Sequence, residues 1–576
     1  WSRILVGYSF DKTTYFYTVI LMSFIFGLSL GSFFIRKKID KIKDLATWLG
    51  TIEVVIGLVS VALLIFFAWL APILIKDRNV FKTWMETVGR DYFIFFVLIS
   101  IPTTLMGFTY PIVSKIYADN IKKLGNRMGT IGFLDTVGSI LGSFIAGFVF
   151  IPFLGVVKSF LFVALINILI GLAMWIFHPA KSRQFKIILT SAVVGFALVL
   201  YFAIPSYQYF TWWDKIGNNP WWGHHYEKVV FYDEGEAATV IVRQYPGENM
   251  RSLVINGHHT AYTTIKDLSV NRQLGYMPYI LHENPKKAMV VGFGLGATTN
   301  ALVQPDMETV EVAEICPGVI KAAPAFARWN KDVVEQPKVE IHDEDGRSWL
   351  FMAENNTYDI ITSNAIHPRL SNNIYTRDFY EICRDKLKDD GIICQWMPQN
   401  WISEEEFMAC LKAFVEAFPH STLWYVNEYS THIIGSKTPI NITHEKVKKA
   451  FENPKLHEEL STVGIIDPEF FLAQYFLSED ELNDYVKGWP VNTDDHPMVE
   501  FSKVINIAPV KQVMIDLKNH DTNYERVISD VKDSEEKSEI RKKIKNYSEF
   551  IRNIMNNVIE KVEYYEENPD YHKQSN

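Results

Sequence analysis

Three glycines alternate at Gly292, Gly294 and Gly296, directly after the apolar run from Ala288 to Val291. Eighteen residues after the last of them, Glu314 closes a second apolar run. Glycines at this spacing permit a tight turn and let a ligand approach the backbone closely, and a carboxylate at the end of the next strand accepts hydrogen bonds from both hydroxyls of a ribose. The pattern predicts a nucleoside site in a doubly wound α/β domain.

Polar residues also follow the next two expected strands. Asp345 and Gly346 come after the third strand, where an adenine edge would lie, and the segment Asn364 to Pro368 follows the fourth, where chemistry usually takes place. Taken alone, the glycines would equally shape a turn in a fold without a ligand. The acidic residues at the expected strand ends favour the nucleoside site.

The elements that must position these residues alternate between strand and helix. Expected strands cover 287–291, 309–313, 338–341, 358–362, 390–395 and 430–435, and expected helices cover 297–304, 317–329, 376–387 and 403–417. This alternation predicts a mostly parallel sheet with helices on both faces. A small β unit over 226–262, with a tight turn at Asn256-Gly257, and a helix over 266–282 precede it.

Six apolar stretches precede residue 205, each near the roughly 20 residues that cross a bilayer. They cover 13–35, 54–75, 93–114, 128–157, 159–180 and 187–204. Small residues from Gly27 to Gly31 and from Gly138 to Gly142 have the spacing that brings membrane helices close together. Asp135 is the main charge within these stretches, and it suits either an intramembrane role or a place near a helix end.

The distribution of Lys and Arg predicts the orientation. One set of loops holds twelve of them, namely Arg36, Lys37, Lys38, Lys41, Lys43, Lys115, Lys122, Lys123, Arg127, Lys181, Arg183 and Lys186. The alternate loops hold five, namely Lys76, Arg78, Lys82, Arg90 and Lys158. The first set is expected to be cytoplasmic. With six spans, the α/β domain would then be extracytoplasmic, and one miscounted helix would reverse this.

The remaining composition divides the chain into four expected parts: a membrane domain at 1–205, an interfacial aromatic segment with the small β unit at 206–265, the α/β domain at 266–510 and a charged amphipathic helical tail at 511–576. Tyr and Trp gathered between 201 and 222 are expected to lie at the lipid headgroups. The net charge of -9 gives no reason to expect nucleic acid as a partner. The four cysteines form no C-x-x-C pair, so we expect buried thiols and no metal.

The motifs resemble spermidine synthases, the aminopropyltransferase branch of the class I methyltransferase-like fold. The matching segments are 289–296, Val312 to Ile315, Asp345-Gly346-Arg347, Tyr358 to Ile361, Tyr375 to Tyr380 and Gly391 to Trp396. The apolar segments 27–32 and 147–152, with Asn492 to Pro497, resemble the fused, membrane-anchored prokaryotic members. Those members usually carry one more helix at the N-terminus, and this chain starts with Trp1, so a seventh span is expected to precede it.

The resemblance implies a site for decarboxylated S-adenosylmethionine, S-adenosylmethionine or the spent thionucleoside. The glycines of the turn, Glu314, Asp345 and Gly346 would hold the nucleoside, with Tyr375 and Gln395 as supporting residues. It also implies an integral protein of a prokaryotic cell membrane, with the lipid bilayer as one partner and a second copy or membrane-complex subunits as others.

The chain departs from the family at the acceptor side. The family's aspartate after the fourth strand, which takes a proton from the attacking amine, is matched by Asn364, and an amide is no base at neutral pH. His367 offers an alternative base, although a plain loop histidine is the simpler interpretation. The carboxylate expected to attract a polyamine is matched by Arg272, which suits a carboxylate- or phosphate-bearing acceptor better.

Two functions therefore remain open. One is a membrane-bound aminopropyl- or methyl-type transferase with Asn364 and His367 near the transferred group. The other is a catalytically degenerate domain that serves as an accessory or scaffold subunit of a membrane complex. The nucleoside residues favour the first, and the two departures favour the second.

Overall fold

The structure is a computed structural model of the chain. It describes residues 14–76, 85, 89–117, 124–177, 182–203, 228–235, 237–246, 250–364, 366–503 and 510–567. The chain divides into two compact units, Trp1–Gly223 with Glu234–Thr239, and His224–Asp233 with Val240–Asn576.

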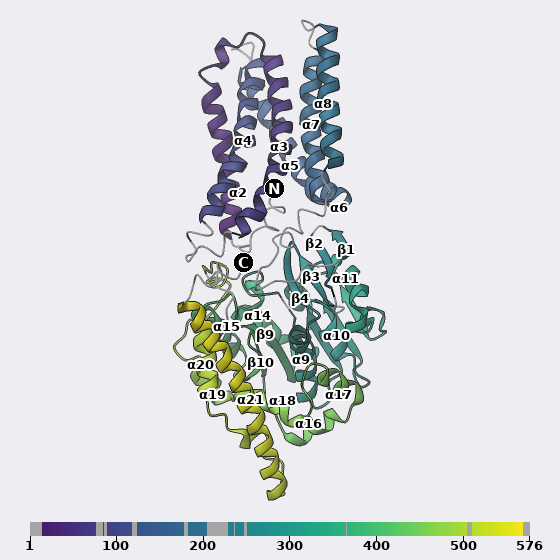
Figure 1. Ribbon diagram of the computed structural model, residues 1–576, viewed down its shortest axis with the longest axis vertical. Coiled ribbons are helices and arrows are strands. Elements are labelled where there is room, and N and C mark those ends of the chain that lie inside the picture. The colour runs from purple at the N-terminus through teal and green to yellow at the C-terminus, as the bar shows by residue number, and fades with distance from the viewer. Residues whose placement is uncertain are drawn as a thin grey trace. The chain divides into compact units, whose positions relative to one another are not determined.

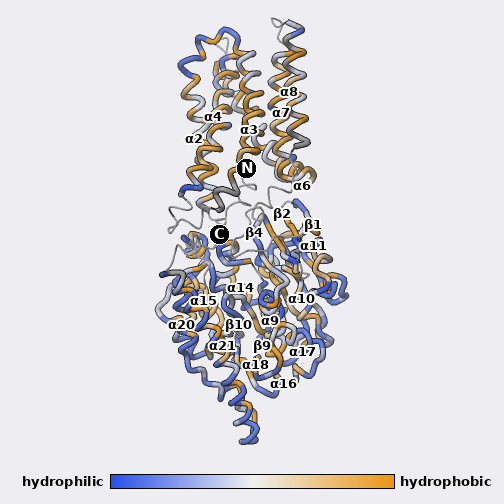
Figure 2. Tube along the Cα trace, viewed as in Figure 1, coloured by the Kyte–Doolittle hydropathy of each residue, from blue (hydrophilic) through white to orange (hydrophobic). Residues whose placement is uncertain are grey.

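The described part of the first unit consists of long apolar helices and one short helix, α6 (Figures 1 and 2). They are α2 (Thr14–Ile35), α3 (Leu45–Lys76), α4 (Arg90–Tyr117), α5 (Leu124–Ile145), α6 (Ile151–Leu154), α7 (Val156–Ile176) and α8 (Arg183–Ala203). Five segments of the described residues are long and apolar enough to cross a membrane: Tyr15–Ile35, Leu45–Phe67, Arg90–Tyr117, Leu124–Leu154 and Val156–Ile176. The sixth expected span folds as α8 but is not among the five, so its crossing stays a prediction.

Glycines bring α2 and α4 into backbone contact, as the spacing from Gly27 to Gly31 predicted. A Cβ on Gly31 would lie 2.1 Å from the Thr104 carbonyl oxygen, and one on Gly107 would lie 2.4 Å from the Leu28 carbonyl oxygen. Gly138 and Gly142 on α5 differ, because no described atom lies within 4 Å of a Cβ built on either. The two similar motifs therefore have different surroundings.

The fourth expected span is interrupted rather than continuous. A π-helical segment, Ala146–Phe150, separates α5 from α6. The helix then ends at Gly155, whose φ is +79°. Pro152 has no backbone N–H to donate, and Gly155 adopts a conformation that other residues rarely reach, so both residues account for the interruption.

The second unit contains two sheets. Four strands form the small sheet in the order β1-β2-β3-β4: β1 (Lys228–Glu234), β2 (Thr239–Gln244), β3 (Arg251–Ile255) and β4 (His258–Tyr262). Asn256 and Gly257 connect β3 to β4 with φ values of +49° and +82°, the left-handed pair that a tight hairpin turn requires. The expected β unit and its turn are thus confirmed.

The large sheet has the order β12-β10-β11-β9-β8-β5-β6-β7. Its strands are β5 (Lys287–Val291), β6 (Thr309–Ala313), β7 (Val339–His342), β8 (Tyr358–Ser363), β9 (Leu387–Pro398), β10 (His420–Asn427), β11 (Ser430–Ser436) and β12 (Tyr475–Leu477). Strands β5 to β9 are parallel, whereas β11, β10 and β12 join antiparallel. Strands β10 and β12 were missing from the expected set.

Helices lie on both faces of this sheet. The helices of the second unit are α9 (Ile265–Leu281), α10 (Ala297–Leu302), α11 (Pro317–Ala322), α12 (Ala327–Asn330), α13 (Gly346–Met352), α14 (Arg377–Lys386), α15 (Glu404–Ala417), α16 (His444–Phe451), α17 (Pro454–Ser461), α18 (Pro468–Ala473), α19 (Glu479–Tyr485), α20 (Lys511–Asn519) and α21 (Ser534–Glu567). The Thr362 hydroxyl donates to the Leu274 carbonyl of α9, whereas Val291 packs beneath Gly346 of α13. Thr362 pairs with Val290, and successive side chains of a strand point to opposite faces, so Thr362 and Val291 lie on opposite faces of the sheet. Helices α9 and α13 therefore cover opposite faces.

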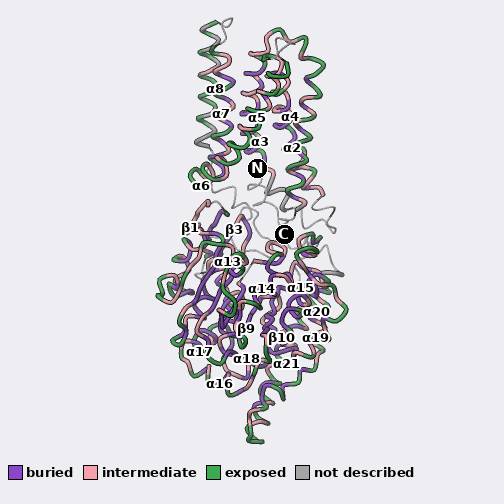
Figure 3. The backbone as a smooth tube through the Cα atoms, turned by 180° about the vertical axis from the view of Figure 1, so that it is seen from behind, coloured by how far each residue is buried: buried purple, intermediate pink, exposed green. Residues whose placement is uncertain are grey.

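The core of the α/β unit lies between these layers, where Figure 3 shows the sheet strands as buried. All four cysteines are buried free thiols, as expected. The tail forms α21, whose apolar face, including Ile551, Met555 and Ile559, is buried. The aromatic cluster between 201 and 222 lies outside the described residues, apart from the helix residues 201–203, whose side chains the structure does not describe.

Candidate nucleoside site

The glycine turn lies at the carboxyl end of β5 and leads into α10. Gly292, Gly294 and Gly296 have φ values of +82°, +57° and +81°, a region that favours glycine. The Gly292 N–H donates to the Ala313 carbonyl at 2.9 Å, which ties the turn to the end of β6. A Cβ on Gly294 would lie 2.7 Å from the Asn364 side-chain nitrogen. The turn therefore needs glycine for both its conformation and its space.

Glu314 lies beside this turn, as the sequence predicted. Its two carboxylate oxygens accept hydrogen bonds from the Phe293 N–H and the Cys316 N–H, each at 2.9 Å. Burial raises the pKa of this carboxyl, and the two backbone hydrogen bonds oppose the rise. A carboxylate oxygen has more than one acceptor site, so Glu314 retains capacity for ribose hydroxyls while it holds the turn.

Asp345 and Gly346 lie at the start of α13, shortly after the carboxyl end of β7, the strand next to β6. The Asp345 carboxylate caps the helix by accepting from the Ser348 N–H at 2.9 Å. A Cβ on Gly346 would lie 2.7 Å from a methyl carbon of Val291. The helix thus starts directly against β5, and this close approach gives Gly346 a packing role besides the predicted ligand role.

Asn364 lies over the glycine turn. Its backbone N–H donates to the Val291 carbonyl at 2.9 Å, and its side-chain nitrogen lies 3.4 Å from the Phe293 carbonyl. Asn271 of α9 approaches the same turn, with its side-chain oxygen 4.0 Å from a Cβ built on Gly294. The sequence motifs identify Asn364, whereas Asn271 belongs to none of the motifs that point to the site.

A titratable carboxyl lies one helical turn before Asn271. The Asn271 side chain donates to the Asp267 backbone carbonyl at 2.7 Å. Burial raises the pKa of the Asp267 carboxyl to about 6, against the opposing effects of the Thr264 hydroxyl and the Lys266 ammonium. Asp267 has no sequence signal of this kind, because nothing in the neighbouring residues indicates that its carboxyl is buried.

His367 is buried and hydrogen-bonded on both ring nitrogens. Its Nε2 lies 2.7 Å from the Asn400 carbonyl oxygen, and its Nδ1 accepts from the Arg369 N–H at 3.2 Å. Burial lowers the pKa of the imidazole to about 3, and Arg369 adds to this effect while the Asn400 contact opposes it. In this conformation neither nitrogen is free to take a proton from a ligand.

Tyr375 and Gln395 are both fully buried on the same face of the sheet as Ser363, which pairs with Gln395 across β8 and β9. Burial raises the pKa of the Tyr375 hydroxyl, and a hydrogen bond with Gln395 partly opposes this rise. Among the described residues, the Ser363 hydroxyl, the Gln395 side-chain oxygen and both polar atoms of the Gln399 side chain have no hydrogen-bond partner. Buried polar atoms without partners are uncommon in folded proteins, and the paired residues Ser363 and Gln395 at the end of β8 suit a polar ligand.

Arg272 points away from the turn toward α17. Its guanidinium donates to the Glu459 backbone carbonyl at 2.8 Å and to the Thr462 hydroxyl, and its Nε lies 3.9 Å from a Glu459 carboxylate oxygen. The Tyr276 hydroxyl and the Asn300 amide also donate to that carboxylate at 2.9 Å. The Arg272 charge is therefore already balanced, which removes the physical basis for expecting it to repel a polyamine.

The segment Asn492 to Pro497 ties the other motifs together. The Asp494 carboxylate accepts from Arg347 at 2.9 Å and from the Thr376 hydroxyl at 2.8 Å. The Arg347 guanidinium lowers the pKa of Asp494. The Asn492 amide donates to the Tyr375 carbonyl at 2.9 Å. This network fixes the starts of α13 and α14 relative to each other.

Two groups of possible metal ligands occur among the described residues: Glu311, Glu340 and His342, and His282, Asp359 and Asp390. Glu311 already accepts from Lys287 and Tyr358 at 2.6 Å, and Asp359 accepts from two backbone N–H groups and from Lys388. Protein donors thus satisfy the most buried carboxylate of each group. The expectation that the chain needs no metal stays a prediction.

The comparisons with known proteins agree with this geometry. Residues 268–443 match the family model described as the spermine/spermidine synthase domain. A polyamine aminopropyltransferase of Oceanobacillus iheyensis is 21% identical over 385 residues, which cover 66% of this chain and 70% of that protein. A polyamine aminopropyltransferase of Thermotoga petrophila is 26% identical over 222 residues, 36% of this chain and 75% of that protein.

Among solved structures, a spermidine synthase in complex with the transition state analogue AdoDATO is 20% identical, with a TM-score of 0.39 over 45% of this chain and 90% of that one. The order of the large sheet, the glycine turn and the acid after β6 define an α/β domain of the methyltransferase-like class. Within this unit, residues 268–443 match the spermine/spermidine synthase domain, and the relatives described above are polyamine aminopropyltransferases.

Proposed function

We propose that this chain is a membrane-bound transferase of the spermidine synthase type, which binds an adenosyl sulfonium donor at the carboxyl ends of β5 and β6. The observation that carries the proposal is Glu314, a buried carboxylate hydrogen-bonded to the N–H of a turn whose three glycines all have positive φ. The unpartnered polar atoms of Ser363 and Gln395 add support, because a donor molecule would supply their partners.

The chemistry is a transfer of carbon from sulfur to nitrogen. The nitrogen lone pair of an amine attacks the carbon attached to the sulfonium, the carbon–sulfur bond breaks, and its electron pair stays on sulfur as a neutral thioether. The amine must give up one proton in the process. Neither the Asn364 amide nor His367, with both nitrogens hydrogen-bonded, accepts that proton readily.

Asp267 is the residue that we assign to this proton. Its carboxyl has a pKa near 6, raised by burial, and it lies one turn along α9 from Asn271, which approaches the glycine turn. A base with a pKa close to the working pH is both deprotonated and able to hold a proton. Asp267→Asn is expected to lower kcat at least about tenfold and to leave the Kd for the donor unchanged.

The test of the proposed site is calorimetric titration of the full chain in detergent micelles. The titrants are decarboxylated S-adenosylmethionine, S-adenosylmethionine and methylthioadenosine. Micromolar binding is expected for at least one of them, and Glu314→Gln should weaken it at least about tenfold, since one charged hydrogen bond is lost. Glu308→Gln is the matched control, because Glu308 is exposed just before the amino end of β6. Absence of binding by all three, from a folded chain, would remove the proposal.

A second function is favoured by the acceptor side. Asn364 replaces the carboxylate that the family uses, and His367 is occupied by Asn400 and Arg369. These contacts suit a domain that has kept its nucleoside site and serves as an accessory subunit of a membrane complex. Donor binding without turnover across a panel of amines, in the wild type and in Asn364→Asp, would favour this function over the transferase.

A further inference from the structure

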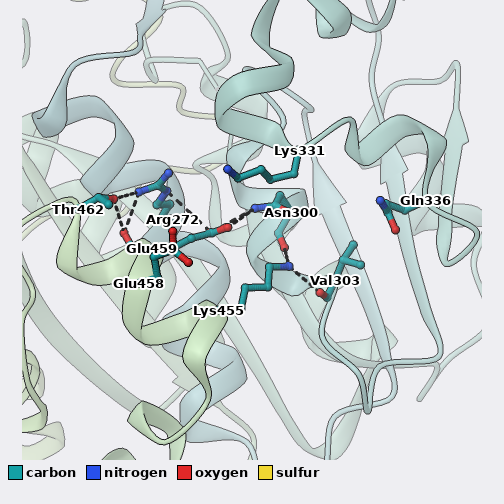
Figure 4. Close-up of a pocket in the computed structure, with 9 residues that line it drawn as sticks. All are labelled: Arg272, Asn300, Val303, Lys331, Gln336, Lys455, Glu458, Glu459 and Thr462. Atoms are coloured by element: carbon teal, nitrogen blue, oxygen red, sulfur yellow. Dashed lines mark hydrogen bonds and ion pairs between the residues drawn. The ribbon is translucent and has the colours of Figure 1, made fainter.

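A pocket lies between α9, α10, α17 and the end of α12 (Figure 4). Its volume is about 370 Å³, and its nine lining residues include none of the three glycines of the turn, Glu314 or Asn364. Since a water molecule takes about 30 Å³ in the liquid, this space holds a small organic molecule.

Buried and hydrogen-bonded charges form one wall of the pocket. Arg272 and Glu459 are each only 7% exposed in their side chains, and their charges balance each other. The Asn300 amide also donates to Glu459, at 2.9 Å. This wall is a rigid polar surface whose charges contribute no net sign.

Two lysines on the other sides give the pocket its positive charge. The Lys455 ammonium donates to the Asn300 and Val303 carbonyls at 3.0 and 2.8 Å, which uses two of its three N–H bonds. The Lys331 backbone N–H donates to the Ala327 carbonyl at 2.8 Å, whereas no described residue forms a hydrogen bond or ion pair with its ammonium group. Burial lowers the pKa of Lys455; the Glu459 carboxylate opposes this effect, and Lys331 adds to it. Against these two cations stands one exposed carboxylate, Glu458.

The backbone at Lys331 is unusual as well. Its φ is +56°, in the left-handed region where glycine and asparagine are the common residues, and the next residue, Asp332, has φ of +51°. Such conformations persist where the surrounding structure requires them, and they cluster at binding sites. Here the turn after α12 directs a lysine, which gains nothing from this conformation, to the edge of the pocket (Figure 4).

We propose that this pocket binds a small anion carrying a phosphate or carboxylate group, held between the Lys331 and Lys455 ammonium groups. The anion would accept from Lys331 and from the remaining N–H of Lys455, and it would relieve the repulsion between the two cations. The site is separate from the nucleoside site, so it would serve for a second ligand rather than for the donor.

The experiment is calorimetric titration of the full chain in detergent micelles, with inorganic phosphate in one arm and succinate in the other. A Kd below about 1 mM is expected in at least one arm. Lys331→Asn, which removes the charge and tolerates the positive φ, should raise that Kd at least about tenfold, whereas Lys331→Arg should change it less than about threefold. Binding of phosphate alone would identify a phosphate-bearing ligand, and binding of succinate alone a carboxylate-bearing one.

Lys449→Asn is the matched control, because Lys449 is an exposed lysine of α16 outside the pocket, and its loss should leave both titrations unchanged. Binding of methylthioadenosine or of the other donors should be equal in all these variants, so failure at one site is distinguished from failure at the other. The proposal is overturned if neither anion binds at concentrations up to about 10 mM, or if Lys331→Asn binds as the wild type does.

Discussion

At the scale of single residues, the candidate site depends on glycines that no other residue replaces. Gly294 combines a φ of +57° with a space that the Asn364 side chain closes to 2.7 Å. We expect Gly294→Ala to lower the free energy of unfolding by about 1–2 kcal/mol and to weaken donor binding at least about tenfold, because the turn must move to admit the methyl group. Thermal unfolding and calorimetric titration measure the two effects.

Gly464 provides the control for this prediction. Its φ is +90°, but no described atom lies within 4 Å of a Cβ built on it. Gly464→Ala should therefore carry a similar conformational cost and leave donor binding unchanged. Equal loss of donor binding in both variants would show that Gly294 acts only through general stability.

His367 makes stability depend on pH. Its pKa is about 3 in the folded chain, lowered by burial, and near 6.5 when unfolded, so the unfolded chain binds more protons between these values. Stability is therefore full above about pH 6.5 and falls by about 1.4 kcal/mol per pH unit as the pH drops toward 3. Unfolding midpoints between pH 7 and 4.5 should fall less steeply for His367→Gln than for the wild type.

His432, also fully buried with a pKa lowered to about 3, has the same effect, so a slope remains in the His367→Gln variant. His496→Gln is the control, since His496 lies exposed in the segment after Asn492. An unchanged slope in His367→Gln would mean that the imidazole is solvated, and its role as a proton acceptor would then be open again.

The residue-level predictions succeeded where the signal is local. Glu314 and the glycines are defined by their distance from apolar runs, and the structure places them side by side. Arg272 illustrates the opposite case, because its partner Glu459 is 187 residues away and no pattern near Arg272 announces it. The burial of His367 depends in the same way on Asn400, which approaches from another strand end.

At the scale of elements, close packing distinguishes two motifs that look alike in the sequence. Gly31 lies against the backbone of α4, whereas no described atom of another element lies within 4 Å of a Cβ built on Gly142 of α5. Gly31→Val should lower the free energy of unfolding in micelles by about 1–3 kcal/mol through overpacking, and Gly142→Val should change it by less than about 0.5 kcal/mol. A larger loss for Gly142→Val would indicate that another helix covers α5 in the membrane.

The strands of the nucleotide-type half were predictable because each is a short apolar run bounded by turn residues. Strands β5 and β6 have the expected bounds, 287–291 and 309–313. Strand β10, 420–427, was not predicted, although its segment from Leu423 to Val426 is apolar. The pattern of alternating strands and helices does not predict two consecutive antiparallel strands such as β10 and β11. Strand β12 has three residues, too few for a periodic signal.

At the scale of the whole molecule, the orientation depends on how many helices cross the bilayer. Five helices qualify by length and composition, and α8 would be the sixth. The excess of Lys and Arg in the loop after α2 predicts that this loop is cytoplasmic. The start of α2 would then lie outside the cell. With six crossings the α/β unit would be extracytoplasmic, where adenosyl donors are scarce. With five crossings it would lie in the cytoplasm, where such donors are made.

Labelling of single added cysteines decides between these arrangements. The four natural cysteines are all buried, so their background reaction with a membrane-impermeant maleimide is expected to be low. Glu539→Cys places a thiol on an exposed position of α21, and Lys37→Cys places one in the basic loop after α2. Intact cells should label Glu539→Cys and should label Lys37→Cys only after permeabilisation. Protection of both sites in intact cells would instead show an even number of crossings between them, as expected if α3, α4, α5 with α6, and α7 span the membrane and α8 does not. The nucleoside site would then lie on the cytoplasmic side.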